Sequence, residues 1–158
     1  MSSEDSHIGK APPIAQRFSL SETATESGVR RLLAQGRARL LAAHVPEARL
    51  GTVELVWAEA LNNIAEHAYA GLEPGIVHID AAIEGRSVSA LIRDRGKPLP
   101  GLTVPLAQLP ASVGPLDSLP EGGFGWFLIN DLCESVAYRR QNGENELSLV
   151  IHSKEHTA

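Results

Sequence analysis

The chain has 158 residues, of which 43% are apolar and 21% are charged, and this balance is typical of a globular protein rather than a disordered one. Its length suits one domain with a core of its own and is too short for two. The formal net charge of -5 argues against a general nucleic-acid binder, because such proteins need a basic face, and a basic protein partner suits the chain better.

The cysteine content and the N-terminal segment indicate the compartment. One cysteine, Cys133, excludes an internal disulfide. The N-terminal segment lacks the apolar centre of a secretory signal, and no apolar run approaches the roughly 20 residues that cross a bilayer. We therefore expect a cytoplasmic protein without membrane insertion. The six histidines show neither HExxH spacing nor a nearby cysteine cluster, which leaves structural zinc unsupported.

The N-terminal part of the chain predicts a leader, a strand and a helix. Residues 1–13 are polar and are typical of a flexible leader. Residues 14–20 alternate enough to form a strand. Ser21 or Thr23 then caps a long helix, whose apolar residues share one face and which ends near Val45, before a proline.

A second helix and a hairpin follow in the middle of the chain. Apolar residues recur at helical spacing from about Arg49 to Tyr69. Two strand-like runs, residues 76–84 and 87–94, are separated by a Gly-Arg pair, which suits a tight antiparallel hairpin.

The C-terminal part begins with a proline-rich segment. Residues 97–121 hold six of the ten prolines and hardly any charge, so they predict a functional lid or a disordered segment. Glycines followed by a helical apolar pattern predict a third helix within residues 121–134. Residues 135–140 and 145–152 complete the chain as a second hairpin.

This order of elements predicts an α+β fold. We expect a two-layer α/β sandwich in which helices cover one face of a mostly antiparallel, mixed sheet. We also expect residues 14–158 to form a single domain that carries the lid.

The first candidate site is a polar stripe on the second helix, within "EALNNIAEHAY". Glu59, Asn63 and His67 are spaced by four residues and share one helix face. One interpretation is a solvated polar face. The other is that the Asn63 amide oxygen binds a hard cation while the Glu59 carboxylate takes a proton.

The second candidate site is the strand end "LIRDRGKP". Asp94 and Gly96 are ordinary turn residues, and a strand-ending turn explains them. Alternatively, Asp94 accepts a hydrogen bond from the exocyclic amine of a purine, and Gly96 lets the ring approach the backbone.

The third candidate site is "EGGFGWFLI", where Gly122, Gly123 and Gly125 lead into a helix. A lid hinge with a helix start explains this pattern. Unpaired backbone N-H groups at a helix N-terminus also form a usual phosphate site. The pattern is neither a Walker motif, since GKS and GKT are missing, nor a Rossmann motif, since no strand precedes it.

In this order, the three motifs resemble the N box and the two glycine boxes of the GHKL superfamily, the ATP-binding domains of histidine kinases and gyrase. "EALNNIAEHAY" is similar to the N box of the RsbW-like anti-sigma factor serine kinases. The resemblance covers residues 14–152. It implies a GHKL ATP-binding fold in which residues 97–121 form the ATP lid.

The resemblance also implies roles for single residues. Asn63 matches the asparagine that binds the Mg²⁺ bridging the ATP phosphates, and Glu59 matches the general base. Asp94, with Gly96 beside it, matches the aspartate that binds the adenine amino group. The glycines of the third site match the residues around the phosphates, which gives cofactor-binding positions at Gly122, Gly123 and Gly125.

The family pattern implies the activity and the partners. It predicts an ATP-dependent serine kinase that phosphorylates a STAS-domain anti-anti-sigma protein and that also binds a sigma factor. Phosphorylation then breaks the complex by adding roughly two negative charges. The oligomeric state is not decided by the sequence, and a homodimer is one alternative, because members of the family often form dimers.

Two departures from the pattern keep other functions open. After Lys97 the lid has no basic residue, so a cation near the γ-phosphate is missing unless Lys97 or Arg95 serves. Trp126, after the glycine box, is interpreted as packing under the lid. The cation-poor lid leaves a nucleotide-gated binding module without kinase activity as an alternative. A detached histidine-kinase catalytic domain is a further alternative.

Overall fold

The computed structural model describes residues 16–105 and 123–152. The strands are β1 (Gln16–Thr23), β2 (Ile76–Glu84), β3 (Ser87–Asp94), β4 (Ser135–Gln141) and β5 (Glu144–His152), and the helices are α1 (Glu26–Ala42), α2 (Glu47–Asn63) and α3 (Gly123–Leu132). A π-helix, η1 (Ile64–Ala68), extends α2, and a 3-10 turn, η2 (Pro100–Leu102), follows β3. Within these ranges, every helix is too short or too polar to span a bilayer. The leader 1–13, Gly122 and most of the predicted lid lie outside the described residues.

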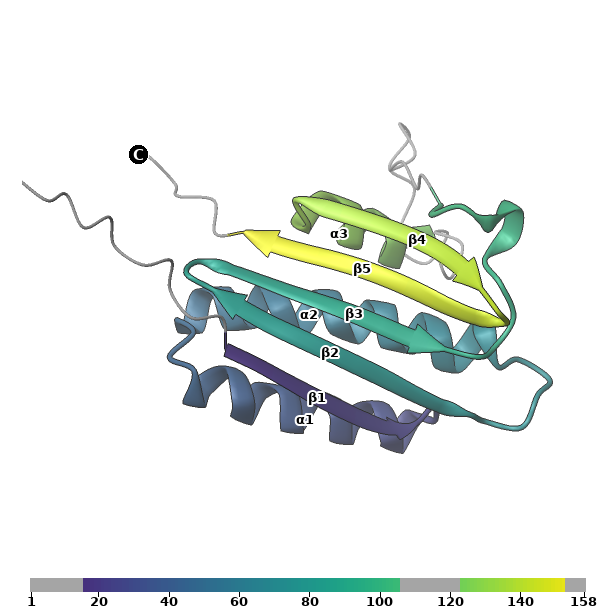
Figure 1. The fold of residues 1–158 in the computed structure, drawn as a ribbon, viewed down its shortest axis with the longest axis horizontal. Helices are drawn as coiled ribbons and strands as arrows, with labels where there is room; N and C mark the ends of the chain where they lie inside the picture. The colour runs from purple at the N-terminus through teal and green to yellow at the C-terminus, as the bar shows by residue number, and fades with distance from the viewer. Residues whose placement is uncertain (1–15, 106–122, 153–158) are drawn as a thin grey trace, which may run out of the picture.

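The strands form one sheet in the order β1-β2-β3-β5-β4, and all pairings between them are antiparallel. The three helices lie on one face of this sheet (Figure 1). The prediction of a two-layer α+β fold is therefore confirmed. The sheet was predicted as mixed, but within the described residues it contains no parallel pair.

Both predicted hairpins are found where their turn residues predict them. β2 and β3 have the predicted bounds and are joined by two residues. β4 and β5 are joined by Asn142 and Gly143, whose φ angles are 53° and 76°. Positive φ at both positions is typical of a type I′ turn, whose twist matches that of paired strands.

The first helix begins later than predicted. Ser21 and Thr23 belong to β1 and pair with β2, and Thr25 caps the helix by accepting a hydrogen bond from the Gly28 N-H at 3.0 Å. Strand pairing therefore outweighs the capping preference of the two earlier hydroxyl residues. The helix also ends at Ala42, ahead of the predicted end near Val45.

The core lies between the sheet and the helices. Leu32 and Leu40 of α1 and Leu50 and Trp57 of α2 are each at most 1% exposed, and they pack against the inward residues of the strands. The Trp57 ring also contacts the ring of Phe18 edge-on, with centroids 6.4 Å apart. This packing fixes α2 against the sheet, so the residues at the end of α2 have a defined position.

Gly28 tests how tightly the start of α1 packs against the end of β1, with Gly51 of α2 as the control. A Cβ atom at Gly28 would lie 1.8 Å from the backbone oxygen of Thr23, so Gly28→Ala has to separate the helix start from the strand. We expect this change to lower the free energy of unfolding in urea by about 1–3 kcal/mol. Gly51 of α2 is the control, because a Cβ there meets open space. Gly51→Ala should instead stabilise the protein by about 0.5–1 kcal/mol, and equal effects of the two changes would contradict the packing.

Candidate active site

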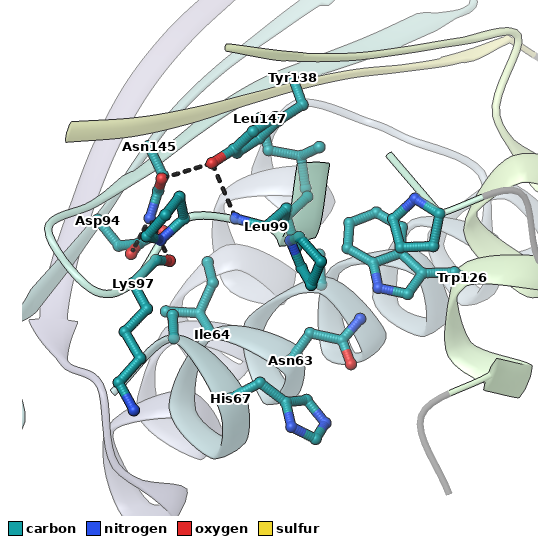
Figure 2. A pocket seen from close by; sticks show the side chains of 15 residues that line it. Asn63, Ile64, His67, Asp94, Lys97, Leu99, Trp126, Tyr138, Asn145 and Leu147 are labelled. Carbon is teal, nitrogen blue, oxygen red and sulfur yellow. Dashed lines mark hydrogen bonds between the residues drawn. The ribbon is translucent and has the colours of Figure 1, made fainter. Parts of the chain in front are cut away.

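A cavity of about 410 Å³ lies where the end of α2, the loop after β3, α3 and the β4–β5 hairpin meet (Figure 2). Its wall is mostly apolar and carries a few polar side chains. It is lined by Ala60, Asn63, Ile64, His67, Ala68, Asp94, Lys97, Pro98, Leu99, Pro100, Pro105, Trp126, Tyr138, Asn145 and Leu147. Small-molecule sites typically have this composition and a volume of about 300–1,000 Å³.

Asn63 lies at the point where the helix changes its hydrogen-bonding pattern. α2 ends at Asn63, and the π-helix η1 follows, with the Tyr69 N-H donating to the Ile64 oxygen at 3.2 Å. π turns are rare and occur frequently at functional sites. The Asn63 Nδ2 atom is buried, and no hydrogen-bond partner for it is found among the described residues. An unsatisfied buried amide costs stability, so Asn63 is a candidate for binding a ligand.

Glu59 lies one helical turn before Asn63 and faces α3. A Cβ atom at Gly125 would come within 2.6 Å of Glu59 Oε2 and within 3.8 Å of Asn63 Nδ2. Glycine at position 125 therefore lets the start of α3 approach both polar side chains. Among the described residues, Asn63 lines the cavity and the half-buried Glu59 does not.

Asp94 is buried at the end of β3, with only 4% of its surface exposed. Its Oδ1 atom accepts hydrogen bonds from the Gly96 N-H at 2.8 Å and from Asn145 Nδ2 at 2.9 Å. These are the hydrogen bonds that Asp94 makes within the described residues, so Oδ2 stays available to a ligand in the cavity. Burial raises the pKa of the Asp94 carboxyl, whereas its hydrogen bonds to Asn145 and Gly96 and the charge of Arg140 lower the pKa.

Gly96 has a packing role in addition to the predicted one, which remains a prediction. A Cβ atom at Gly96 would lie 2.5 Å from the backbone oxygen of Ala68, and Gly96 is not part of the described cavity wall. The next residue, Lys97, donates its N-H to the same oxygen at 2.7 Å. Gly96 therefore allows the loop after β3 to pack against the end of η1.

Lys97 and Arg95, the two residues considered as cations near the phosphates, have different partners. Lys97 lines the cavity, and its Nζ donates to the Ala70 oxygen at 2.6 Å. The Arg95 guanidinium lies 3.8 Å from a carboxylate oxygen of Glu144 and is not part of the described wall. Of these two, Lys97 is better placed to reach a ligand.

The structure brings some of the predicted site residues together. Asn63 and Asp94 line one cavity, and Gly125 leaves no room for a Cβ atom beside Glu59 and Asn63. Gly123 begins α3, and Gly122 lies outside the described residues. The roles predicted for these residues remain predictions.

Sequence reasoning missed Tyr138 and Asn145, which contribute polar groups to the cavity. A signal for Asn145 was present in the sequence. Asn145 alternates with Leu147, Leu149 and Ile151 on the inward face of β5, so its polar side chain is buried among apolar ones. A buried polar side chain among apolar ones has to be hydrogen-bonded, so this pattern predicts a hydrogen-bonding role for Asn145.

Trp126 is 7% exposed and lines the cavity, and its packing under the lid stays a prediction. Asn130, one turn later on α3, donates to the Trp126 oxygen at 2.9 Å and to the Pro105 oxygen at 3.1 Å. The loop after β3 is thereby tied to α3 at Pro105. Within the described ranges, no group of three or more His, Cys, Asp or Glu side chains is arranged to hold a metal ion.

Comparison with known proteins gives one family and several relatives. The histidine kinase-like ATPase domain matches residues 22–151. The chain is 35% identical over 105 residues to the serine/threonine-protein kinase BtrW of Bordetella bronchiseptica, which covers 65% of this chain and 70% of that protein. It is 33% identical over 91 residues to the serine-protein kinase RsbW of Oceanobacillus iheyensis, which covers 54% of each.

A solved structure shares the fold. The structure of the RsbU and RsbW domains of Rv1364c from Mycobacterium tuberculosis matches with a TM-score of 0.61 at 19% identity. The match covers 87% of this chain and 32% of that one, so the chain spans about a third of its length. At this identity the likeness concerns the fold alone.

The raised pKa of Asp94 predicts a pH-dependent stability difference. A carboxyl with a raised native pKa stabilises the fold when it is protonated, and this contribution is lost as the pH rises through the native pKa. Asp94→Asn keeps an oxygen for the Gly96 and Asn145 donors and removes the buried charge. We therefore expect Asp94→Asn to unfold at a higher temperature than the wild type at pH 8, with a smaller difference at pH 4. A difference that grows toward low pH would contradict the raised pKa.

Proposed function

The chain belongs to the histidine kinase-like ATPase family and is an RsbW-like serine kinase of that family, and we propose that its cavity binds magnesium ATP for phosphoryl transfer to a serine of a partner protein. The observation that carries the proposal is that Asn63, from a helix, and Asp94, from a strand, line one cavity. A polar group at each end of an apolar wall suits a ligand with an apolar ring and charged phosphates.

The adenine end of the site is formed by Asp94. Its Oδ1 is used by Gly96 and Asn145, so Oδ2 is the acceptor that we assign to the 6-amino group of adenine. The neighbouring wall includes Ile64, Leu99 and Leu147, which provide apolar contacts for the ring. A carboxylate beside an apolar surface selects a base that donates at this position.

The phosphate end of the site is formed by the end of α2 and the start of α3. Asn63 would hold the Mg²⁺ ion, which supplies positive charge to the phosphates when it is bound. In this proposal the ion would bind Asn63 Oδ1, whereas the unpartnered Nδ2 is a donor and fits a phosphate oxygen. The close approach of Gly125 brings the start of α3 to the same place. Gly123 and Gly125 offer backbone N-H groups in the first turn of α3, and we assign Gly122 to the same site.

Glu59 is the proposed general base. Its Oε2 lies close to the Gly125 backbone, beside Asn63, where an acceptor hydroxyl entering the phosphate end would come within reach. The carboxylate takes the proton of the serine hydroxyl as that oxygen attacks the γ-phosphorus, while the bond from this phosphorus to the β,γ-bridging oxygen breaks and ADP leaves. The rest of catalysis consists of positioning and charge neutralisation, so no nucleophile is needed from this chain.

The partner is a protein rather than a small molecule in this proposal. We propose a STAS-domain anti-anti-sigma protein as the phosphate acceptor and a sigma factor as the second partner, in a partner-switching system. BtrW, a serine/threonine-protein kinase matched over 70% of its length, supports a protein as the phosphate acceptor. A homodimer is part of the proposal, and a nucleic-acid partner is not, given the net charge of -5.

A second candidate function is a nucleotide-gated binding module without kinase activity. The Lys97 ammonium group is engaged with the Ala70 oxygen, and Arg95 pairs with Glu144. Without a further cation near the γ-phosphate, transition-state charge is poorly neutralised. Such a protein would bind its partner in a nucleotide-dependent manner and leave the partner unphosphorylated.

Calorimetry of ATP binding, with Mg²⁺ and with EDTA, tests the site. We expect Asp94→Asn to weaken binding by about 10-fold or more under both conditions, because the amide places a donor against the adenine amino group. Asn63→Ala should weaken binding in Mg²⁺ by a similar factor and have little effect in EDTA. Asn62→Ala, at the neighbouring position, is the control and should bind as the wild type does. Unchanged affinity in both site variants would remove the proposed site.

Transfer of labelled phosphate to a STAS-domain partner tests the activity. We expect Glu59→Gln to lower the transfer rate by about 100-fold or more, since it removes the proton acceptor, with ATP affinity within about 2-fold of the wild type. Glu66→Gln on η1 is the control and should transfer normally. A wild type that binds the partner in the presence of ATP without transferring phosphate would favour the binding module instead.

A further inference from the structure

The β4–β5 hairpin holds the loop after β3 through one buried side chain. Asn145 is 5% exposed, and its Nδ2 donates to Asp94 Oδ1 at 2.9 Å, to the Lys97 oxygen at 3.0 Å and to the Gly96 oxygen at 3.3 Å. Its Oδ1 accepts from the Tyr138 hydroxyl at 2.6 Å and from Arg140 Nη1 at 2.8 Å. Both ends of the Asn145 amide are therefore engaged within the protein.

Tyr138 extends this network to the start of the lid. Its hydroxyl accepts a hydrogen bond from the Leu99 N-H at 3.0 Å while it donates to Asn145 (Figure 2). Leu99 directly precedes η2, at the described start of the lid, and also lines the cavity. Arg140 adds a second bond to the same loop, from Nη1 to the Gly96 oxygen at 2.9 Å.

We propose that Asn145 is a positioning residue that sets the nucleobase selectivity of the site, by fixing the orientation of Asp94, and that Tyr138 couples this orientation to the start of the lid. The inference deepens the proposed function, since it rests on Asp94 binding the adenine amino group. Asn145 does not need to touch the nucleotide in this role.

The geometry gives the physical reason for the selectivity. Asn145 Nδ2 and the Gly96 N-H both bind Oδ1, so rotation of the carboxylate would break two hydrogen bonds in a buried setting. Oδ2 is thereby kept at one place in the cavity. A fixed acceptor distinguishes a base that donates from one that does not, whereas a mobile carboxylate can turn away from the mismatch.

The same network opposes the effect of burial on Asp94. Burial, together with the charge of Glu144, raises the pKa of Asp94, while hydrogen bonding to Asn145 and the charge of Arg140 lower the pKa. The Tyr69 hydroxyl also lies near, where it accepts the Arg95 N-H at 2.9 Å. Removing the Asn145 amide therefore raises the pKa of Asp94 further, so that Asp94 is protonated, and loses strength as an acceptor, at a higher pH.

The test compares ATP with purine riboside triphosphate, which lacks the 6-amino group. Magnesium complexes of both are titrated by calorimetry between pH 5 and 8 into the wild type, Asn145→Ala, Tyr138→Phe and Ser148→Ala. We expect Asn145→Ala to reduce the preference for ATP by about 10-fold, and its ATP affinity should fall at a higher pH than in the wild type. Tyr138→Phe should reduce the preference by a smaller factor. Ser148, an exposed residue on the same strand, is the control and should keep wild-type values.

The outcomes separate the inference from the proposed function. If the wild type binds ATP without preference over the analogue, the proposed adenine site is wrong. If the wild type prefers ATP and Asn145→Ala retains the same preference and pH profile, the positioning role is overturned. Should Asn145→Ala fail to fold, Tyr138→Phe decides the question, because it keeps the ring and removes only the hydroxyl. An unchanged preference in Tyr138→Phe would then overturn the inference.

Discussion

The site depends on one close contact between two segments that are far apart in the chain. The Ala68 oxygen at the end of η1 accepts the Lys97 N-H, and Gly96 packs directly against Ala68. The Tyr69 hydroxyl accepts the Arg95 N-H beside it. These contacts fix the end of the helix that carries Asn63 relative to the strand end that carries Asp94. Together with the packing of α2 against the sheet, they set the separation of the two polar ends of the cavity.

The cavity also shows how buried polar groups serve binding at a cost to stability. Asp94 is buried with a raised pKa, and the Asn63 amide has a buried nitrogen without a partner in the described part of the chain. Each feature is unfavourable for folding alone and favourable for a ligand that completes the hydrogen bonding. The apolar core around Trp57, Leu32 and Leu50 supplies the stability that offsets these costs.

Much of the fold and part of the site could be predicted from the sequence. The hairpins and the second helix have strong periodicity and turn residues. The resemblance to RsbW-like kinases was drawn from three motifs, and the family match and the relatives confirm the family. The start of α1 was missed because Ser21 and Thr23 fit a cap as well as a strand, and only pairing with β2 decides. The packing of Gly96 against Ala68 was missed because it depends on a contact between segments that are far apart in the chain.

The contact at Gly96 has a consequence for how the sequence can vary. The space that a side chain at position 96 would need already holds the carbonyl and the Cβ atom of Ala68. The two positions therefore share a single small volume, and enlarging either residue displaces the other. Among homologous chains we expect both positions to stay small or to change as a correlated pair, with any bulkier residue at one matched by a shift of the helix end at the other.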